Sequence, residues 1–269
     1  MAGIDHSLFD LTALDTLAYQ DSPVHRLDAR AKVLTVLVFV VVVASYDKYA
    51  VLVLLPLLLF PVSLLIMARL PVAFLFKRLA LVAPFALLVG IFNPIFDQQV
   101  QLQLGGLAIS GGWLSFLSII LRFTLTIGSV LVLIAVTSFP AICHALGRLG
   151  VPWTFVLQLL FLYRYIFVLG TEAERMVRAR SLRSFHGRGN GLKVYAALLT
   201  QLLWRTLERA RRLYRAMLSR CFSGRFRLLS TSRFGPKELL FVVGWSGYFI
   251  LLRLGCDAAA VRGWLEGVF

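Results

Sequence analysis

The feature that most constrains this chain is a series of apolar runs, several of them about 20 residues long, the length an α-helix needs to cross the hydrocarbon core of a bilayer. Hydrophobic residues make up 59% of the 269 residues and charged residues only 15%, with a mean hydropathy of +0.82. This composition excludes an ordinary soluble domain. Because the apolar runs are continuous and do not alternate with polar residues, a transmembrane β-barrel is disfavoured. The sequence therefore predicts an all-α, polytopic membrane protein.

Hydropathy and loop charge together predict about five transmembrane helices. Basic residues collect in the loops expected on the cytoplasmic side, whereas 97–112 has none and is expected outside. The first 30 residues contain five aspartates and no apolar core, so no cleavable signal peptide is expected. The spans are predicted at about 33–46, 49–67, 79–96, 113–139 and 239–254. The resulting regions are an N-terminal arm with a charged collar (1–28), a four-helix transmembrane region (29–139), a basic region (140–236), and a last transmembrane helix with the C-terminal tail (237–269).

Most of the positive charge lies in one stretch, 171–237, which holds 16 of the 28 Lys and Arg residues but only three acids. Periodicity predicts two helices around it, the first running from Pro152 to about 185 and the second over 192–222. A glycine-rich segment at 187–191 is expected to form the turn between them. The second helix carries an apolar stripe that is predicted to pack against the first, formed by Leu203, Leu207, Ala210, Tyr214, Met217 and Cys221.

The first half of the first helix, 153–169, is apolar enough to be taken for another span. Arg164 lies in its middle, however, and a crossing here would move the basic stretch to the opposite side of the membrane. We therefore expect a tilted or interfacial helix. Arg122, within the span at 113–139, has two open interpretations: it extends to the outer interface, or it pairs inside the bundle or lines a path.

Two arginines stand out from the basic stretch. Arg180 and Arg220 each lie near the C-terminal end of a predicted helix, where the helix dipole favours a cation. A planar guanidinium there can form a forked pair of hydrogen bonds with a carboxylate of a partner protein. Most of the remaining arginines are expected only to attract anionic lipid headgroups.

Several kinds of chemistry find no support in the sequence. There is no Gly-rich phosphate loop followed by Lys and Ser or Thr, and no set of catalytic side chains, so we predict that the chain is not an enzyme. Asp5 and His6 are adjacent and form only a weak metal-binding pattern. The remaining candidates are too dispersed to predict a metal site, a disulfide or a bound cofactor. They are Cys143, Cys221, Cys256, His25, His144 and His186.

The order of these features resembles one known family over essentially the whole chain: the transmembrane subunit of energy-coupling factor (ECF) transporters, the EcfT family, and within it the CbiQ type of cobalt transport. The segments that carry the resemblance are 25–32, 149–152, 164–165, 174–181 and 208–222. In that family two Ala-Arg-Gly motifs end two coupling helices and dock into grooves of two ABC-type ATPase subunits. The corresponding residues here are Ala179-Arg180-Ser181 and Ser219-Arg220-Cys221. Both arginines match but neither glycine does, and Ser and Cys resist conformations that glycine permits.

The resemblance implies a non-catalytic coupling subunit of an ATP-driven cobalt or nickel importer in the inner membrane of a prokaryotic cell, with the coupling helices in the cytoplasm. It implies two ABC ATPase subunits (CbiO-like) that bind the ATP, a substrate-binding membrane subunit (CbiM-like), and a small accessory membrane subunit (CbiN-like). No nucleic acid is implied. Two alternatives stay open at this point: a membrane protein whose basic face binds anionic lipid, and a self-contained channel or secondary carrier.

Overall fold

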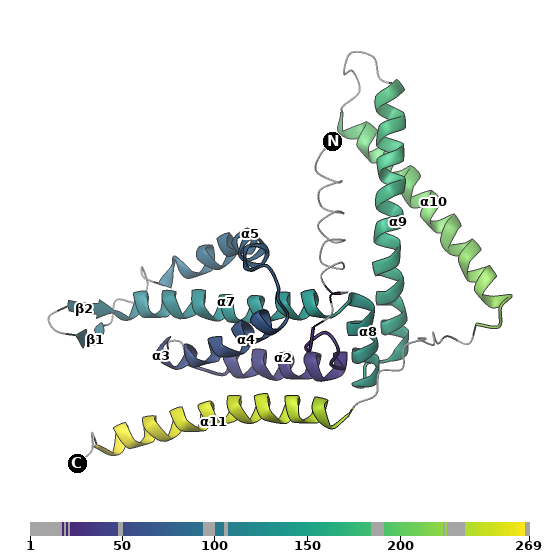
Figure 1. Ribbon diagram of the computed structural model, residues 1–269. Helices are drawn as coiled ribbons and strands as arrows, with labels where there is room; N and C mark the ends of the chain where they lie inside the picture. The colour runs from purple at the N-terminus through teal and green to yellow at the C-terminus, as the bar shows by residue number, and fades with distance from the viewer. Residues whose placement is uncertain are drawn as a thin grey trace. The chain divides into compact units, whose positions relative to one another are not determined.

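The computed structural model describes residues 18, 20, 22–47, 51–93, 100–104, 107–183, 191–222, 224 and 235–266 (Figure 1). One short antiparallel hairpin, β1 (Val100–Leu104) and β2 (Leu107–Ser110), accompanies the helices. The helices are α2 (Ala29–Ala44), α3 (Val51–Leu54), the 3-10 turn η1 (Pro56–Leu58), α4 (Leu59–Met67), α5 (Val72–Gly90), α7 (Gly111–Val136), α8 (Phe139–Arg148), α9 (Trp153–Arg183), α10 (Leu192–Leu218) and α11 (Pro236–Glu266).

The chain divides into two compact units, with the boundary inside α8. The bundle unit contains the described residues between Asp15 and Ile142 together with those from Ser232 onward. The helical-pair unit contains the described residues between Cys143 and Thr231. The predicted division into four regions stays a prediction.

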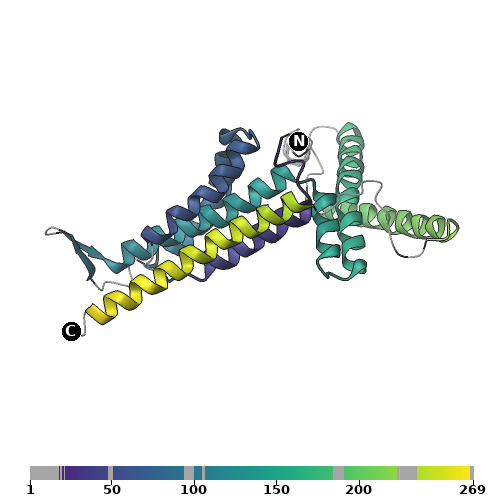
Figure 2. The same cartoon turned by 60° about the horizontal axis from the view of Figure 1, so that its bottom comes forward.

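In the bundle unit, α2 lies between α7 and α11, and α5 and α4 pack on α7 (Figures 1 and 2). Three fully buried aromatic rings hold this arrangement together. The ring of Phe39 in α2 lies 4.9 Å from that of Phe60 in α4 and 5.2 Å from that of Phe249 in α11. The rings of Phe60 and Phe249 are 5.1 Å apart and nearly perpendicular, a favourable aromatic geometry. Phe39 therefore ties the valine-rich α2 to α4 and α11.

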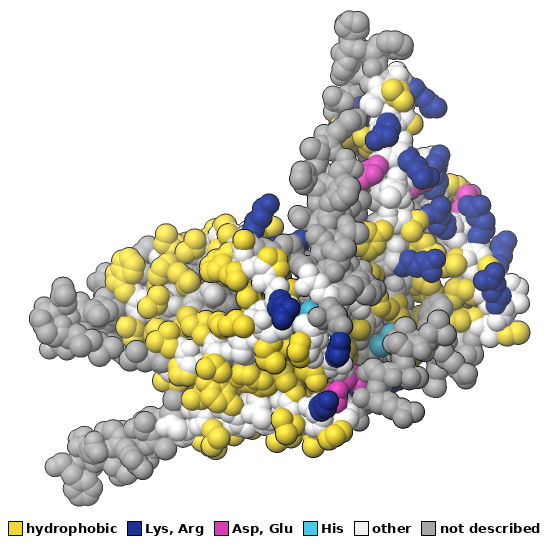
Figure 3. Space-filling view, viewed as in Figure 1, with side chains coloured by type: hydrophobic (Ala, Val, Ile, Leu, Met, Phe, Trp, Pro, Cys, Tyr) yellow, Lys and Arg dark blue, Asp and Glu magenta, His cyan; other side chains and the backbone are white. Residues whose placement is uncertain are grey.

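The outside of the bundle unit is apolar. Figure 3 shows hydrophobic side chains over most of the visible face of this unit. On α5, Leu81 is 81% exposed and Phe85 is 74% exposed, and on α11 Leu240 is 75% exposed. An exposed apolar surface of this extent is typical of a protein that faces lipid or another membrane protein.

Among the described residues, three helices are long and apolar enough to cross a membrane: Gly112–Val136, Trp153–Arg183 and Pro236–Gly255, with Pro56–Met67 as a shorter apolar segment. This confirms an all-α membrane protein. Trp153–Arg183 corresponds to α9, whose first half was expected to be interfacial, so its length and composition also fit a span. α2, the first predicted span, has 16 residues. The five-span topology with its inside and outside loops stays a prediction.

Two predicted spans differ in detail from the helices observed. The span at 49–67 is broken into α3, η1 and α4, because Pro56 has no N–H to continue the hydrogen-bond ladder of α3. The span at 79–96 is α5, which begins at Val72. Lys77 and Arg78 fall between the predicted spans 49–67 and 79–96, where a basic cytoplasmic loop is expected. Both are helical, since long basic side chains favour helices and can extend away from apolar surroundings. The segment 97–112, expected as a loop, contains the β1–β2 hairpin.

The helical-pair unit begins with the second half of α8. A tight turn follows, in which Val151 N–H donates to Leu146 O (3.1 Å) and Gly150 adopts φ +111°. Glycine is suited to this left-handed conformation. Pro152 then precedes α9, and α10 crosses α9 at a wide angle in both ribbon views (Figures 1 and 2). As predicted, one continuous helix runs from Trp153 past 172, and a second helix begins at 192. The predicted turn at 187–190 lies outside the described residues.

Candidate functional site

The candidate site is the pair of crossed helices α9 and α10, which carry two candidate arginines. Among the described residues of these helices, the exposed basic side chains cover α10 and the second half of α9 (Figure 3). Two of the three acids of the basic stretch, Glu172 and Glu208, have partners near the crossing. Arg205 Nη1 lies 2.5 Å from Glu172 Oε1 in an ion pair between the helices, and Trp204 Nε1 donates to Glu208 Oε1 at 3.1 Å. The surface that remains is therefore strongly cationic.

Arg180, in the first motif, contacts the other helix. Its guanidinium carbon lies 5.1 Å from the centre of the Tyr195 ring in α10, which is within the range of a cation–π interaction. The Glu172–Arg205 and Arg180–Tyr195 contacts thus connect the same two helices at two separated points.

The first motif is helical throughout. Ser181 lies inside α9, which continues to Arg183, and its Oγ donates to Arg178 O at 2.8 Å. Its φ is not in the left-handed region. The backbone at this position therefore does not require glycine, and the replacement of glycine by Ser181 leaves the helix intact.

The second motif ends its helix in a different way. Cys221 adopts φ +55°, the left-handed conformation that favours glycine. Cys221 N–H donates to Leu218 O (3.0 Å), and Phe222 N–H donates to Met217 O (3.1 Å). This is the hydrogen-bond pattern of a Schellman motif, in which two otherwise unpaired carbonyls of the last turn gain partners. Cys221 thus occupies the backbone conformation for which the glycine of the family motif is suited, and Arg220, just before it, is exposed.

The predicted apolar stripe of α10 is not the face that packs. Leu203, Leu207 and Tyr214 are 60%, 49% and 62% exposed. The more covered residues of α10 lie mainly on an adjacent face: Val194, Leu198, Leu202, Thr206, Leu213 and Met217. The prediction that the stripe packs along α9 is wrong, because the more covered face of α10 is the adjacent one.

Arg122 and Arg164 lie in different units and have different surroundings. Arg122, in α7, donates from its guanidinium to Asp47 O, just beyond the end of α2. Both interpretations of Arg122 stay predictions. Arg164 is exposed on the apolar half of α9.

One residue that the sequence left unassigned is Lys32. It ends the run of charged residues over 25–32, the charged collar, which continues past residue 28 into α2, yet it is only 5% exposed. Its Nζ donates to Val136 O, at the last residue of α7 (3.3 Å), and to His25 O (3.5 Å). A cation at the C-terminal end of a helix is favoured by the helix dipole. The available sequence signal was its spacing, because Lys32 shares one helical row with the buried residues Val36, Phe39 and Val43.

Within the described part of the chain, no three His, Cys, Asp or Glu residues come together as a metal site. The buried Cys143 lies in α8, where burial raises the pKa of its thiol to about 11 and keeps it protonated. The ring of His144 lies 5.4 Å from that of Trp153, an ordinary packing contact. Asp5, His6 and His186 lie outside the described residues, and so does the side chain of Cys256.

Comparison with known proteins gives a consistent result. The sequence matches the family CbiQ, described as a cobalt transport protein, over residues 20–229. An EcfT protein of Heliobacterium modesticaldum, named as an energy-coupling factor transporter transmembrane protein, is 29% identical over 87% of this chain and 93% of its own length. The cobalt transport protein CbiQ of Rhodobacter capsulatus is 37% identical over 35% of this chain and 40% of its own length.

A further relative, an uncharacterized protein of Methanocaldococcus jannaschii, is 31% identical over 61% of this chain. The match spans 57% of the length of that archaeal protein and 40% of the length of the Rhodobacter protein. The family match itself runs over most of the present chain and includes α9, α10 and both arginine motifs. The chain therefore belongs to the CbiQ family of cobalt transport proteins.

Proposed function

We propose that this chain is the transmembrane coupling subunit of an ATP-driven importer of the ECF type, and that the imported ion is Co²⁺ or Ni²⁺. Membership of the CbiQ family supports transport, and the names of the relatives support an ECF complex. The observation that carries the coupling role is the helix pair α9 and α10. Each helix has a signature arginine at its C-terminal end, and two side-chain contacts between the helices hold the crossing.

In this proposal two ABC ATPase subunits (CbiO-like) bind and hydrolyse the ATP, because the chain has no phosphate loop of its own. Arg180 and Arg220 each bind a carboxylate in a groove of one ATPase. Closure of the ATPases on ATP then moves the ends of α9 and α10. Because packed helices shift between discrete arrangements, the pair transmits this motion as a unit.

The motion would pass to a separate substrate-binding membrane subunit (CbiM-like), aided by a small accessory subunit (CbiN-like). The metal ion is the substrate of the complex and would be held by that other subunit. The positive charge of the helical-pair unit supports a cytoplasmic position for it, in a chain inserted in the inner membrane. No resident cofactor is proposed for this chain.

Co-purification tests the proposal. An affinity tag on this chain should recover two ATPase chains and a metal-binding membrane subunit from detergent-solubilised membranes. ATP hydrolysis should follow the ATPase chains through further separation, and cells that express the complete set should accumulate radioactive cobalt. ATP turnover, or metal uptake in vesicles, by this chain after removal of every other chain would contradict the proposal.

A further inference from the structure

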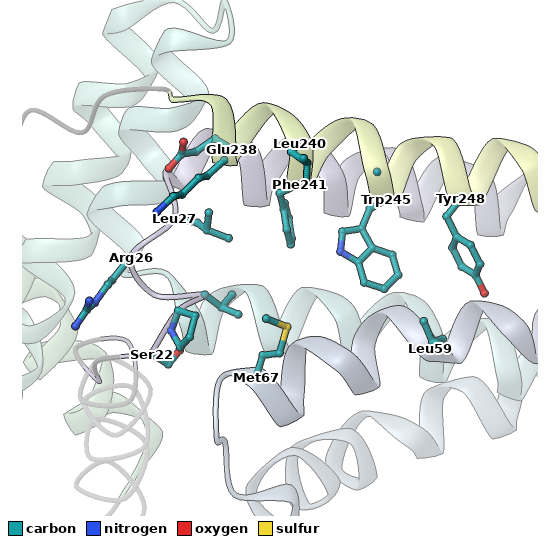
Figure 4. A pocket seen from close by; sticks show the side chains of 14 residues that line it. Ser22, Arg26, Leu27, Leu59, Met67, Glu238, Leu240, Phe241, Trp245 and Tyr248 are labelled. Carbon is teal, nitrogen blue, oxygen red and sulfur yellow. The ribbon is translucent and has the colours of Figure 1, made fainter.

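The bundle unit contains a groove that the coupling role does not use. It has a volume of about 1110 Å³ and runs between α11, α4 and the segment before α2 (Figure 4). Phe241, Trp245 and Tyr248 point from α11 toward α4, which contributes Leu59 and Met67 to the opposite wall. Leu240, 75% exposed, extends the apolar surface at the side. The body of the groove is therefore hydrophobic.

The two ends of the groove differ in chemistry. At one end Arg26 and Lys237 line it, and both are exposed. Glu238 lies at the same end, but its Oε2 accepts a hydrogen bond from Gly235 N–H at 2.9 Å. At the other end the hydroxyl of Tyr248 donates to Pro56 O at 3.0 Å and joins α11 to η1. The end with Arg26 and Lys237 thus carries two cations against one carboxylate, and at the other end a hydrogen bond joins α11 to η1.

The dimensions match an extended hydrocarbon chain. Lys237 and Tyr248 are eleven residues apart on α11, which at 1.5 Å per residue corresponds to roughly 17 Å along the helix axis. Gly244 lies between them and lines the groove without a side chain, so the space beside Trp245 stays open. The side chain of Trp245, which lines the groove, is held in place because its ring packs against that of Phe60 with centroids 5.0 Å apart.

We propose that this groove binds a phospholipid with an anionic headgroup. The headgroup lies at Arg26 and Lys237, and an acyl chain follows Phe241, Gly244 and Trp245 toward Tyr248. The choice of a lipid follows from the arrangement of charge: cations at one end and an apolar channel behind them are complementary to an anionic amphiphile. The inference rests on the chain lying in a membrane and not on the proposed transport partners.

Trp245 provides a direct readout, because bromine atoms on an acyl chain quench the fluorescence of a tryptophan that they contact. The full-length chain is placed in phosphatidylcholine vesicles that contain increasing fractions of either brominated phosphatidylglycerol or brominated phosphatidylcholine. The chain has five tryptophans, so the Trp245 signal is the difference between the wild-type protein and Trp245→Phe. We expect brominated phosphatidylglycerol to quench this signal at a mole fraction lower by about fivefold or more.

Matched variants separate lipid binding in the groove from general attraction of lipid to the protein surface. Arg26→Ala and Lys237→Ala should each reduce the preference for the anionic lipid, whereas Lys77→Ala removes an exposed basic residue away from the groove and should leave it unchanged. Gly244→Leu should lower quenching by both lipids, since it fills the groove. Gly247→Leu is the control, because a Cβ at either glycine meets no atom within 4 Å and only Gly244 lines the groove.

Three results would overturn the proposal. Equal quenching by the two lipids would mean ordinary solvation by the bilayer. A preference that Lys77→Ala weakens as much as Lys237→Ala would mean general attraction to a charged surface. Little quenching by either lipid would mean that a protein segment or a second copy of the chain fills the groove.

Discussion

At the scale of single residues, the two arginine motifs are not equivalent. Ser181 is helical, with its hydroxyl bonded to Arg178 O, whereas Cys221 adopts φ +55° at the end of α10. The sequence alone could not separate them, because both positions depart from the same family glycine. What separates them is whether the helix ends there, and that depends on the carbonyls of Met217 and Leu218 finding N–H partners beyond the last turn.

Restoring glycine should therefore have opposite effects at the two positions. Cys221→Gly should raise stability by about 1 kcal/mol, because it removes the steric cost of the left-handed conformation. Ser181→Gly should lower stability by about 0.5–1 kcal/mol, because glycine in a helix is entropically unfavourable. Thermal unfolding of the two purified variants in the same detergent measures the difference. A change of the same sign in both would contradict the assignment of Cys221 to the helix end.

Lys32 is a charged residue whose burial the charge pattern of the sequence did not predict. Its position in the collar 25–32 suggested a residue at the membrane surface, yet it is buried and bonded to Val136 O, at the end of α7. The collar therefore joins two helices that are far apart in the sequence. If charge alone is considered, every lysine is expected to be exposed to solvent. The helical spacing of Lys32, however, places it on the same side of α2 as buried residues.

At the scale of the elements, hydropathy located the helices well, but their ends and contacts were less predictable. The helix expected to start at Pro152 is observed as α9, Trp153–Arg183. Its start was predictable because a proline favours the first turn of a helix. Hydropathy did not predict the break at Pro56, because the break comes from a missing backbone N–H. It also did not predict the early start of α5, because hydropathy counts Lys77 and Arg78 as polar although their long side chains can extend away from an apolar helix. The packing face predicted for α10 was wrong, because the face of a helix that packs depends on how its neighbouring helix crosses it.

The ion pair between Glu172 and Arg205 should contribute little to stability but should hold the crossing of α9 and α10. Their side chains are 21% and 51% exposed, and a pair of this kind is worth about 0.2–1 kcal/mol in a double-mutant cycle. Glu172→Arg and Arg205→Glu should each reduce metal uptake by the assembled transporter, and the double charge exchange should restore part of it. Arg211→Glu, on an exposed position of α10, serves as the control. A double variant no better than the singles would contradict a role for this pair.

At the scale of the whole molecule, the prediction concerns the sides of the membrane. In a background without Cys143, Cys221 and Cys256, a cysteine at Gln103 in the β1–β2 hairpin should react with an impermeant reagent added outside intact cells. A cysteine at Leu182, which is 79% exposed near the end of α9, should react only after permeabilisation, because the basic helical pair is expected inside. Labelling of Leu182→Cys from outside would contradict the proposed orientation.

The central claim, that two particular arginines couple this chain to ATPases, is tested most directly by measuring cobalt uptake and complex recovery for Arg180→Ala, Arg220→Ala and Arg211→Ala at equal expression. If Arg180 and Arg220 each pair with a carboxylate in an ATPase groove, truncating either should cost about 2–5 kcal/mol of association, because a buried charge is left unpaired. Arg→Lys should rescue poorly, since an ammonium cannot form the fork, and Arg211→Ala should be nearly silent. Equal, mild losses in all three alanine variants would contradict the claim and would leave these arginines as part of a surface that binds anionic lipid.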